Sequence, residues 1–346
     1  MTRRRRASQH SVKLVFAPLM TIEENIPLAP LTTFKIGGPA RFFVRVKNID
    51  ELREALAFAK EKNISFFILG GGSNILVRDE GFPGLVIKIE IGGIEEKDGL
   101  LIAGAGEEWD ALVLYVVKKN LWGIENLSGI PGSVGAAPVQ NIGAYGAELK
   151  ETLSFVEAFD MSRGLIVRFS NAECGFGYRT SMFKKEPGRF CITSVELKLS
   201  KNGVPNLSYR DLQGLKNPSL LLVREAVLGI RAKKFPDLTQ EGTAGSFFLN
   251  PIVSKEKIEE LLRRFPQLLK FPAENGVKIS LAWLLDRALK LKGTKRGSAR
   301  LFERQPLVIA AKRGARAGDV RELAEFVASR MREELKIEIE PEVRIL

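Results

Sequence analysis

The segment from Gly123 to Gly146, GIENLSGIPGSVGAAPVQNIGAYG, could bind an anionic group through its backbone, because it is rich in glycine and poor in large side chains. Glycine permits positive φ angles and leaves backbone N–H groups accessible, so consecutive amides can point into one concavity and hold a pyrophosphate. A long surface loop is the alternative interpretation. Interleaved apolar residues such as Ile124 and Ile130 argue against a solvated linker. The segment therefore predicts a phosphate cradle packed against a flat aromatic group.

A second glycine-rich turn, GGGSNIL at 70–76, follows an apolar run at 64–69 that we expect to be a buried strand. It is not a P-loop, because no Gly-Lys-Ser/Thr follows it. Gly104 and Gly106 do not form a Rossmann fingerprint either, since Trp109 stands where a third glycine is required. Two separate glycine-rich turns favour one extended ligand held from two sides, and a dinucleotide fits that arrangement better than a single phosphate.

The composition excludes several kinds of catalysis. His10 is the only histidine and stands in a polar, arginine-rich N-terminal stretch, so histidine bases, catalytic triads and HExxH zinc sites are not expected. Two cysteines, Cys174 and Cys191, cannot form a disulfide framework or a zinc cluster, which favours a reducing cytoplasm and predicts no metal. If the protein is an enzyme, an organic cofactor is expected to supply the difficult chemistry.

The net charge of +12 fits either a nucleic-acid partner or small polyanionic ligands. Part of it belongs to the cluster Arg3–Arg6, which we interpret as a disordered tail. No aromatic and basic RNA-binding motif or helix-turn-helix pattern accompanies the charge, so nucleic acid is not the expected partner. No apolar run is long enough to span a bilayer, and no signal peptide is visible.

Hydrophobic periodicity predicts alternating strands and helices. Asn48 and Glu51 form a pair typical of a helix start, and the expected helices lie near 48–59, 109–119, 220–231, 254–265, 280–291 and 318–335. The expected strands are 40–46, 64–69, 85–89, 100–103, 153–159, 165–169, 191–199, 308–311 and 337–345. A composition change at 233–237 marks a domain boundary.

Six separated motifs carry a family resemblance. The segments TTFKIGGPA, GGGSNIL, SGIPGSVGAAPVQNIGAYG, FGYR, GTAGSFFLNP and PEVRIL occur in the order found in UDP-N-acetylenolpyruvoylglucosamine reductases, and the match spans about 25–346. The resemblance implies an α+β fold with a two-lobed FAD-binding domain of the p-cresol methylhydroxylase or vanillyl-alcohol oxidase type, then a small α/β substrate domain. We divide the chain accordingly into a basic arm (1–20), lobe 1 (21–90), lobe 2 (91–232, with a substrate loop at about 202–217) and a C-terminal domain (233–346).

The resemblance also implies a reaction. NADPH would reduce FAD, and the flavin would deliver hydride to the enolpyruvyl double bond of UDP-N-acetylglucosamine enolpyruvate, giving UDP-N-acetylmuramate for peptidoglycan synthesis. A monomeric cytoplasmic enzyme is expected. Two alternatives stay open: a related FAD oxidase or dehydrogenase acting on a hydroxy acid or sugar, and a flavin-free basic protein that binds polyanions.

Such a reaction needs a proton donor, a cation and a group that orients them. Positions matching the family motifs supply Ser246 as donor, Arg179 for the substrate carboxylate or enolate, and Glu342. Without the motifs, Ser246 would be a turn or cap residue, Arg179 a surface ion-pair partner and Glu342 an exposed carboxylate. The sequence leaves open whether Glu342 is offset by Arg179 or carries a proton.

The resemblance also implies which residues contact FAD and the UDP-sugar. For FAD they are Gly70, Gly71, Gly72, Ser73, Asn74, Gly132, Ser133, Gly135, Ala136, Asn141, Gly143, Ala144 and Gly146. For the UDP-sugar they are Tyr178, Tyr209, Lys234, Asn250 and Gln305. Two positions depart from the family pattern: Leu249 stands where lysine is expected, and Thr180 stands where aspartate is common.

Overall fold

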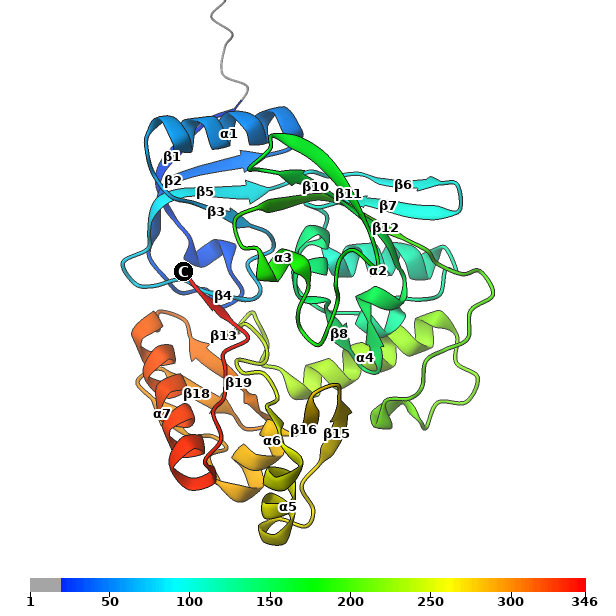
Figure 1. The fold of residues 1–346 in the computed structure, drawn as a ribbon, viewed down its shortest axis with the longest axis vertical. Helices are drawn as coiled ribbons and strands as arrows, with labels where there is room; N and C mark the ends of the chain where they lie inside the picture. The colour runs from blue at the N-terminus through cyan, green and yellow to red at the C-terminus, as the bar shows by residue number, and fades with distance from the viewer. Residues whose placement is uncertain (1–19) are drawn as a thin grey trace, which may run out of the picture.

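The computed structural model of the protein describes residues 20–346. The sheets of two lobes lie in the upper part of Figure 1, and the C-terminal third of the chain lies mostly below them. The predicted basic arm at 1–20 lies outside the described residues apart from Met20, and so does His10.

The first lobe is a four-stranded sheet in the order β1-β2-β5-β3, with helix α1 packed on it (Figure 1). Its elements are β1 (Glu23–Pro27), β2 (Pro39–Val46), α1 (Ile49–Glu61), β3 (Phe66–Leu69) and β5 (Phe82–Ile89). Strands β2 and β3 each pair with β5 in parallel. The expected helix start is confirmed, because the Asn48 side chain accepts a hydrogen bond from the Glu51 N–H.

The second lobe is an antiparallel sheet in the order β11-β10-β12-β7-β6. Its strands are β6 (Ile94–Lys97), β7 (Leu100–Gly104), β10 (Leu153–Asp160), β11 (Leu165–Ser170) and β12 (Phe190–Leu197). A short hairpin, β8 (Gly143–Ala144) and β9 (Ala147–Glu148), ends the glycine-rich segment. The helices are α2 (Trp109–Lys118), α3 (Met182–Lys185) and α4 (Leu220–Lys234).

Helix α4 is longer than expected. It continues through Lys234 because the Phe235 N–H still bonds to the Arg231 carbonyl, and the first residue without an N–H is Pro236. The boundary that we placed between 232 and 233 therefore falls inside the last turn of a helix.

The C-terminal third contains two small sheets. One has the order β13-β19-β18-β17, built from β13 (Glu241–Gly242), β17 (Lys295–Arg296), β18 (Ala299–Phe302) and β19 (Gln305–Lys312), and packs against α7 (Ala317–Leu335). The other has the order β14-β16-β15, built from β14 (Ile252–Val253), β15 (Lys270–Ala273) and β16 (Gly276–Ile279), beside α5 (Lys255–Arg264). The expected helix at 280–291 is one short turn, α6 (Leu281–Trp283), followed by a π-helical turn (Leu284–Ala288).

The end of the chain returns to the first lobe (Figure 1). Strand β20 (Arg344–Ile345) pairs in parallel with β4 (Ile75–Leu76), directly after the second glycine turn. The expected strand at 337–345 is therefore wrong over most of its length. Ile337 and Ile339 are buried on either side of an exposed residue, which is strand-like, but Pro341 is exposed and has no N–H, and it forms an isolated bridge with Phe248.

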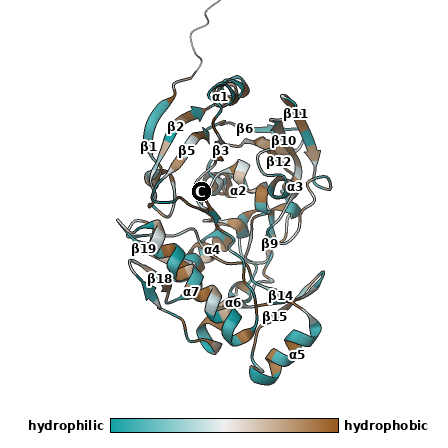
Figure 2. Cartoon of the chain, turned by 60° about the vertical axis from the view of Figure 1, so that its left-hand side comes forward, coloured by the Kyte–Doolittle hydropathy of each residue, from teal (hydrophilic) through white to brown (hydrophobic). Residues whose placement is uncertain are grey.

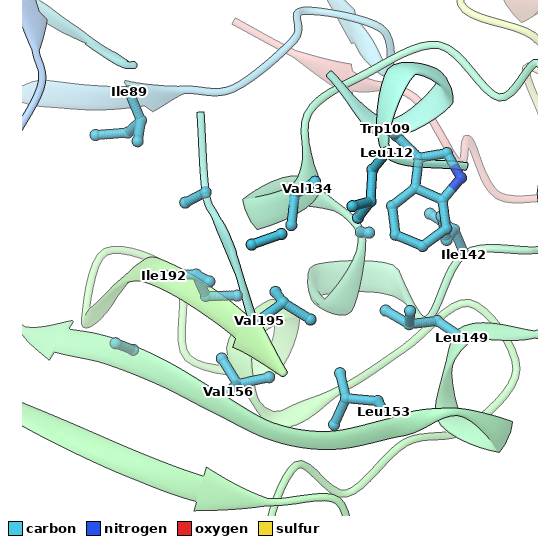
Figure 3. Packing of buried hydrophobic residues seen from close by; sticks show 14 of the residues in the cluster. Ile89, Trp109, Leu112, Val134, Ile142, Leu149, Leu153, Val156, Ile192 and Val195 are labelled. Carbon is cyan, nitrogen blue, oxygen red and sulfur yellow. The ribbon is translucent and has the colours of Figure 1, made fainter. Parts of the chain in front are cut away.

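The core explains why the glycine-rich segment is not a surface loop. Val134 and Ile142 are buried in the same cluster as Trp109 and Leu112 of α2 (Figure 3). The Trp109 indole N–H donates to the Leu127 carbonyl at 3.0 Å. In the C-terminal domain, α5 and α7 each mix hydrophilic and hydrophobic residues (Figure 2), as expected of helices that bury one face. The expectation that the glycine-rich segment 123–146 packs inside the protein is therefore confirmed.

Candidate active site

One large cavity of about 1210 Å³ lies where the two lobes and the C-terminal domain meet. Its wall is formed by both glycine-rich turns, the end of α4, and the segments 236–246 and 341–344. Parts of the chain that are far apart in sequence thus enclose a single space large enough for a dinucleotide and a second ligand. Among residues 20–346 no group of acidic, cysteine or histidine side chains could hold a metal ion.

The two glycine turns meet backbone to backbone. A Cβ at Gly71 would lie 2.4 Å from the Gly132 Cα, and a Cβ at Gly132 would lie 2.8 Å from the Ser73 Oγ. Within residues 20–346, the N–H groups of Gly71 to Asn74 have no hydrogen-bond acceptor, and the buried Ser133 Oγ has no partner. Free donors on residues that line a cavity fit an anionic ligand such as the pyrophosphate of FAD.

Most residues expected to contact FAD line this cavity: Gly70, Gly71, Gly72, Ser73, Asn74, Gly132, Ser133, Ala136, Gly143 and Ala144. Three do not. Gly135 lines a smaller adjoining pocket. Asn141 is fully buried, and its amide donates to the Glu148 carboxylate and the Gly177 carbonyl, so it holds the loop against the FGYR segment. The Gly146 carbonyl accepts from Asn206, which ties the loop to the substrate loop.

Arg179 and Glu342 form an ion pair on the cavity wall, with 3.1 Å between Arg179 Nε and Glu342 Oε1. Arg179 sits in a tight turn closed by hydrogen bonds between Gly177 and Thr180, and its φ of 53° is unfavourable for a side chain larger than glycine. Its guanidinium also donates to the Gly143 carbonyl at 2.7 Å. The arginine is therefore fixed between the main glycine loop and the C-terminal segment.

Glu342 is a largely buried carboxylate, with 11% of its side chain exposed, and its backbone is bonded to the serine motif. Its N–H donates to the Phe247 carbonyl at 2.8 Å, and its own carbonyl accepts from the Asn74 amide. Burial raises the pKa of the Glu342 carboxyl, and the nearby charges of Arg179 and Lys184 offset only part of that rise. The geometry favours an ion pair with Arg179, while burial makes the carboxyl easier to protonate than usual.

Ser246 lines the same cavity on the segment adjoining Glu342. It follows Gly245, which has a φ of 78°, and it forms a bridge with Val308 of β19. The next residue is anchored on both sides, since Phe247 donates to the Leu307 carbonyl and accepts from the Glu342 N–H. Within residues 20–346 the Ser246 hydroxyl has no hydrogen-bond partner, so it is available to a ligand.

Comparison with known proteins agrees with this architecture. The family model of the FAD binding domain matches residues 40–170, and that of the C-terminal domain of UDP-N-acetylenolpyruvoylglucosamine reductase matches 237–346. The reductase of that name from Neisseria gonorrhoeae is 40% identical over 338 residues, covering 94% of this chain and 97% of the relative. The one from Pseudomonas aeruginosa is 37% identical, covering 93% and 98%. The chain belongs to the UDP-N-acetylenolpyruvoylglucosamine reductase family.

A crystal structure of the reductase from Thermus caldophilus superposes on this one with a TM-score of 0.69 at 29% identity, covering 94% of this chain and 99% of that one. The expected α+β fold, an FAD-binding part followed by the reductase C-terminal domain, is confirmed by these matches.

Three of the residues expected to bind the UDP-sugar line the cavity of this reductase: Tyr209, Lys234 and Gln305. The Lys234 ammonium donates to the Tyr209 hydroxyl at 2.8 Å and pairs with Asp211 at 2.7 Å. Tyr209 also stacks edge-on against Tyr145 with ring centroids 5.1 Å apart. The substrate loop is thus fastened to the last residue of α4 and to the main glycine loop.

Tyr178 and Asn250 lie outside the lining of the cavity. The Asn250 amide and the Tyr178 hydroxyl are 3.4 Å apart, and the Asn250 carbonyl oxygen accepts from the N–H of Leu281 at the start of α6. The Lys278 ammonium lies 4.2 Å from the centre of the Tyr178 ring. These two residues therefore join the FGYR turn to the C-terminal domain beside the cavity.

The two departures from the family pattern have different settings in this reductase. Thr180 closes the turn that carries Arg179, and Arg179 has its acidic partner in Glu342 instead of the adjacent residue. Leu249 bonds through its backbone to the Glu340 carbonyl and does not line the cavity. Neither departure disrupts the arrangement of Ser246, Arg179 and Glu342.

Sequence reasoning missed three charged residues at the site. Lys184 lines the cavity and donates to the Arg179 carbonyl at 3.0 Å. Asp211 pairs with Lys234, and Arg231 lines the cavity one turn before it. Lys184 lies five residues after Arg179 and Asp211 lies two residues after Tyr209, so this proximity in the sequence was the available signal. No helix among residues 20–346 is long and apolar enough to cross a membrane.

Proposed function

We propose that this FAD-dependent oxidoreductase uses NADPH to reduce UDP-N-acetylglucosamine enolpyruvate to UDP-N-acetylmuramate, a step in peptidoglycan precursor synthesis. Family membership supports the overall reaction. The observation that carries the proposal is that Ser246 and the Arg179–Glu342 pair face the same cavity as the two glycine turns. A proton donor and a carboxylate-binding cation are thus placed beside the cofactor cradle.

The free amides of 71–74 and the Ser133 hydroxyl would hold the FAD pyrophosphate. When bound, FAD accepts hydride from NADPH and supplies it to the carbon–carbon double bond of the enolpyruvyl group. Side chains in the cavity wall bind the substrate, stabilise the developing charge and donate the proton.

Arg179 binds the enolpyruvyl carboxylate, on which negative charge builds as hydride is added, because a fixed guanidinium stabilises such charge strongly in a site shielded from water. Ser246 gives its hydroxyl proton to the carbon next to the one that receives hydride. A serine can do so only when the acceptor is strongly basic and the resulting alkoxide is stabilised. Glu342 keeps Arg179 in place through their ion pair.

The nucleotide end of the substrate is held at the end of α4. Lys234 provides positive charge for the diphosphate, and Tyr209 covers the nucleotide from the substrate loop, with Gln305 on the cavity wall nearby. Tyr178 and Asn250 support this end through the FGYR turn. We also propose that the chain divides into two FAD-binding lobes and a substrate domain, that it is located in the cytoplasm and that it is a monomer. The cysteines support a reducing compartment, since both are free and buried.

Ser246→Ala tests the assignment in two separate half-reactions. We expect the variant to retain FAD and to be reduced by NADPH at the wild-type rate, whereas reoxidation by the enolpyruvyl substrate slows by about 10²–10⁴-fold. Anaerobic stopped-flow absorbance measures both steps. Ser329→Ala, which removes a hydroxyl from α7 outside the cavity, is the matched control. Reoxidation of Ser246→Ala at the wild-type rate would show that Ser246 is not the proton donor.

A further inference from the structure

Helix α4 ends with two cations directed toward the cavity. Arg231 and Lys234 are three residues apart, so they share one face of the helix, and both line the cavity. Lys233 stands between them in sequence, is exposed and does not line the cavity. The C-terminal end of a helix carries only about half a negative charge, which cannot neutralise two cations.

The two cations differ in their partners. Lys234 has an acidic partner in Asp211 at 2.7 Å. The acid near Arg231 is Asp110, but both of its oxygens are taken by the Arg224 guanidinium at 2.6 and 2.8 Å, and one also accepts from the Gly129 N–H. Among residues 20–346 no carboxylate lies within ion-pair distance of Arg231. Its charge is therefore not neutralised by the protein.

Arg231 is also partly shielded from water. Its guanidinium carbon lies 4.7 Å from the centre of the Phe235 ring, and a Cβ at Gly129 would come within 3.0 Å of its Cδ. Burial lowers the pKa of Arg231, and the Tyr145 hydroxyl and the Asp110 carboxylate offset only part of that effect. A half-buried cation with no carboxylate at ion-pair distance is costly, so a ligand that brings negative charge into the cavity would complete the site.

The position of Arg231 indicates which ligand brings that charge. It packs against Gly129 at the start of the Gly129–Gly132 turn, which belongs to the proposed cofactor cradle, whereas the nucleotide is assigned to Lys234 and Tyr209. Hydride transfer from NADPH adds two electrons and one proton to FAD, so the reduced cofactor carries one more negative charge than the oxidised one. Protein charges near the flavin change the relative stability of its oxidised and reduced states.

We propose that Arg231 binds the negative charge that FAD gains on reduction, and so makes the protein hold reduced FAD more tightly than oxidised FAD. This inference rests on the proposed function, because it assumes that FAD occupies the cavity and is reduced there. Arg231 then acts on the cofactor, and its effect is separate from the proton donation assigned to Ser246.

The test is the midpoint potential of bound FAD, measured by equilibration with a reference dye. Arg231→Gln and Arg231→Met should lower the potential, and each tenfold loss of the preference for reduced FAD corresponds to about 30 mV for a two-electron couple. Arg231→Lys, which keeps the charge, should shift it less. Lys233→Met removes a positive charge from the same turn outside the cavity and should leave the potential unchanged.

Affinity of the apoprotein for oxidised and for chemically reduced FAD provides a second readout if a variant purifies without cofactor. A selective loss for reduced FAD supports the proposal, whereas an equal loss in both redox states overturns it. An unchanged potential with a raised KM for the UDP-sugar would assign Arg231 to the nucleotide instead and also overturn it. Because a chemical reductant replaces NADPH in these measurements, failure of NADPH to reduce the wild type would count only against the proposed function.

Discussion

The Arg179–Glu342 pair shows how single residues in this cavity are held by segments far apart in the chain. Arg179 adopts a left-handed backbone conformation, which costs a non-glycine residue about 1 kcal/mol or more. The turn hydrogen bonds, the Lys184 contact to its carbonyl and the ion pair with Glu342 together hold it there. Strain supported from several directions is typical of a preorganised functional residue.

Glu342→Gln should change how stability depends on pH. The folded-state pKa of Glu342 lies above the usual carboxyl value, so the folded protein binds this proton more tightly than the unfolded chain does. The unfolding free energy of the wild type should therefore fall, relative to that of Glu342→Gln, as pH rises from below the ordinary carboxyl pKa through the raised one. Urea unfolding across this pH range measures the difference. A difference between the two proteins that does not vary with pH would contradict the raised pKa.

Parts of the site could be predicted at residue level and parts could not. Ser246, Arg179 and Glu342 stand in recognisable motifs, and the structure brings all three to one cavity. The lack of a carboxylate partner for Arg231 could not be predicted. It arises because Asp110 pairs with Arg224, which is 114 positions away in the sequence. Asn141 was expected at the ligand but holds the loop from within, since a buried amide bonds most readily to nearby backbone.

Among the structural elements, the two glycine-rich turns pack directly against each other, and neither leaves room for a side chain where they meet. Gly71→Ala should weaken FAD binding, since its Cβ would lie 2.4 Å from the Gly132 Cα and the backbone of one turn must move. Overpacking of this kind costs about 1–3 kcal/mol, which corresponds to a rise in Kd of about fivefold to 150-fold. Titration of the apoprotein with FAD measures it.

Gly229→Ala serves as the matched control for this prediction. Gly229 lies in α4, and a Cβ there would meet nothing within 4 Å. Its substitution should leave FAD affinity unchanged and slightly stabilise the helix. If both variants bound FAD as the wild type does, the close approach of the two turns would not be part of the cofactor site.

Most elements could be predicted from periodicity, and the errors have a common cause. The helix cap at Asn48 and the buried strands of both lobes follow from local pattern. The terminal segment at 337–345 alternates like a strand because it is buried on one side, but its backbone partners lie in distant parts of the chain. Local pattern reports burial, whereas pairing between separated segments depends on tertiary structure.

At the scale of the whole molecule, the C-terminal domain is clamped onto the first lobe. Asp79 accepts hydrogen bonds from the N–H groups of Ala317 and Gly318, at 2.8 and 3.1 Å, and so caps helix α7 from another domain. Nearby, β20 pairs with β4, and the Arg344 N–H donates to the Asn74 carbonyl. The second glycine turn is therefore connected directly to the segment that carries Glu342.

Asp79→Ala should lower the unfolding free energy by about 0.5–2 kcal/mol, the usual cost of losing a helix cap. Asp79→Asn keeps an acceptor oxygen and should lose less. Asp50→Ala, which removes an exposed carboxylate from the first turn of α1, provides a control outside the domain contact. Urea unfolding of the FAD-bound protein measures all three. An Asp79→Ala loss no larger than that of Asp50→Ala would show that the clamp does not contribute to stability.

The proposed reaction requires that FAD bound in one cavity accepts electrons from NADPH and delivers them to the enolpyruvyl group. The most direct test is the absorbance spectrum of the purified protein between about 300 and 550 nm, recorded anaerobically before and after NADPH and then after UDP-N-acetylglucosamine enolpyruvate, since flavins absorb in this range. We expect flavin bands that bleach with NADPH and return with the enolpyruvyl substrate. Bands that return only when oxygen is admitted, or a protein that cannot bind added FAD, would contradict it.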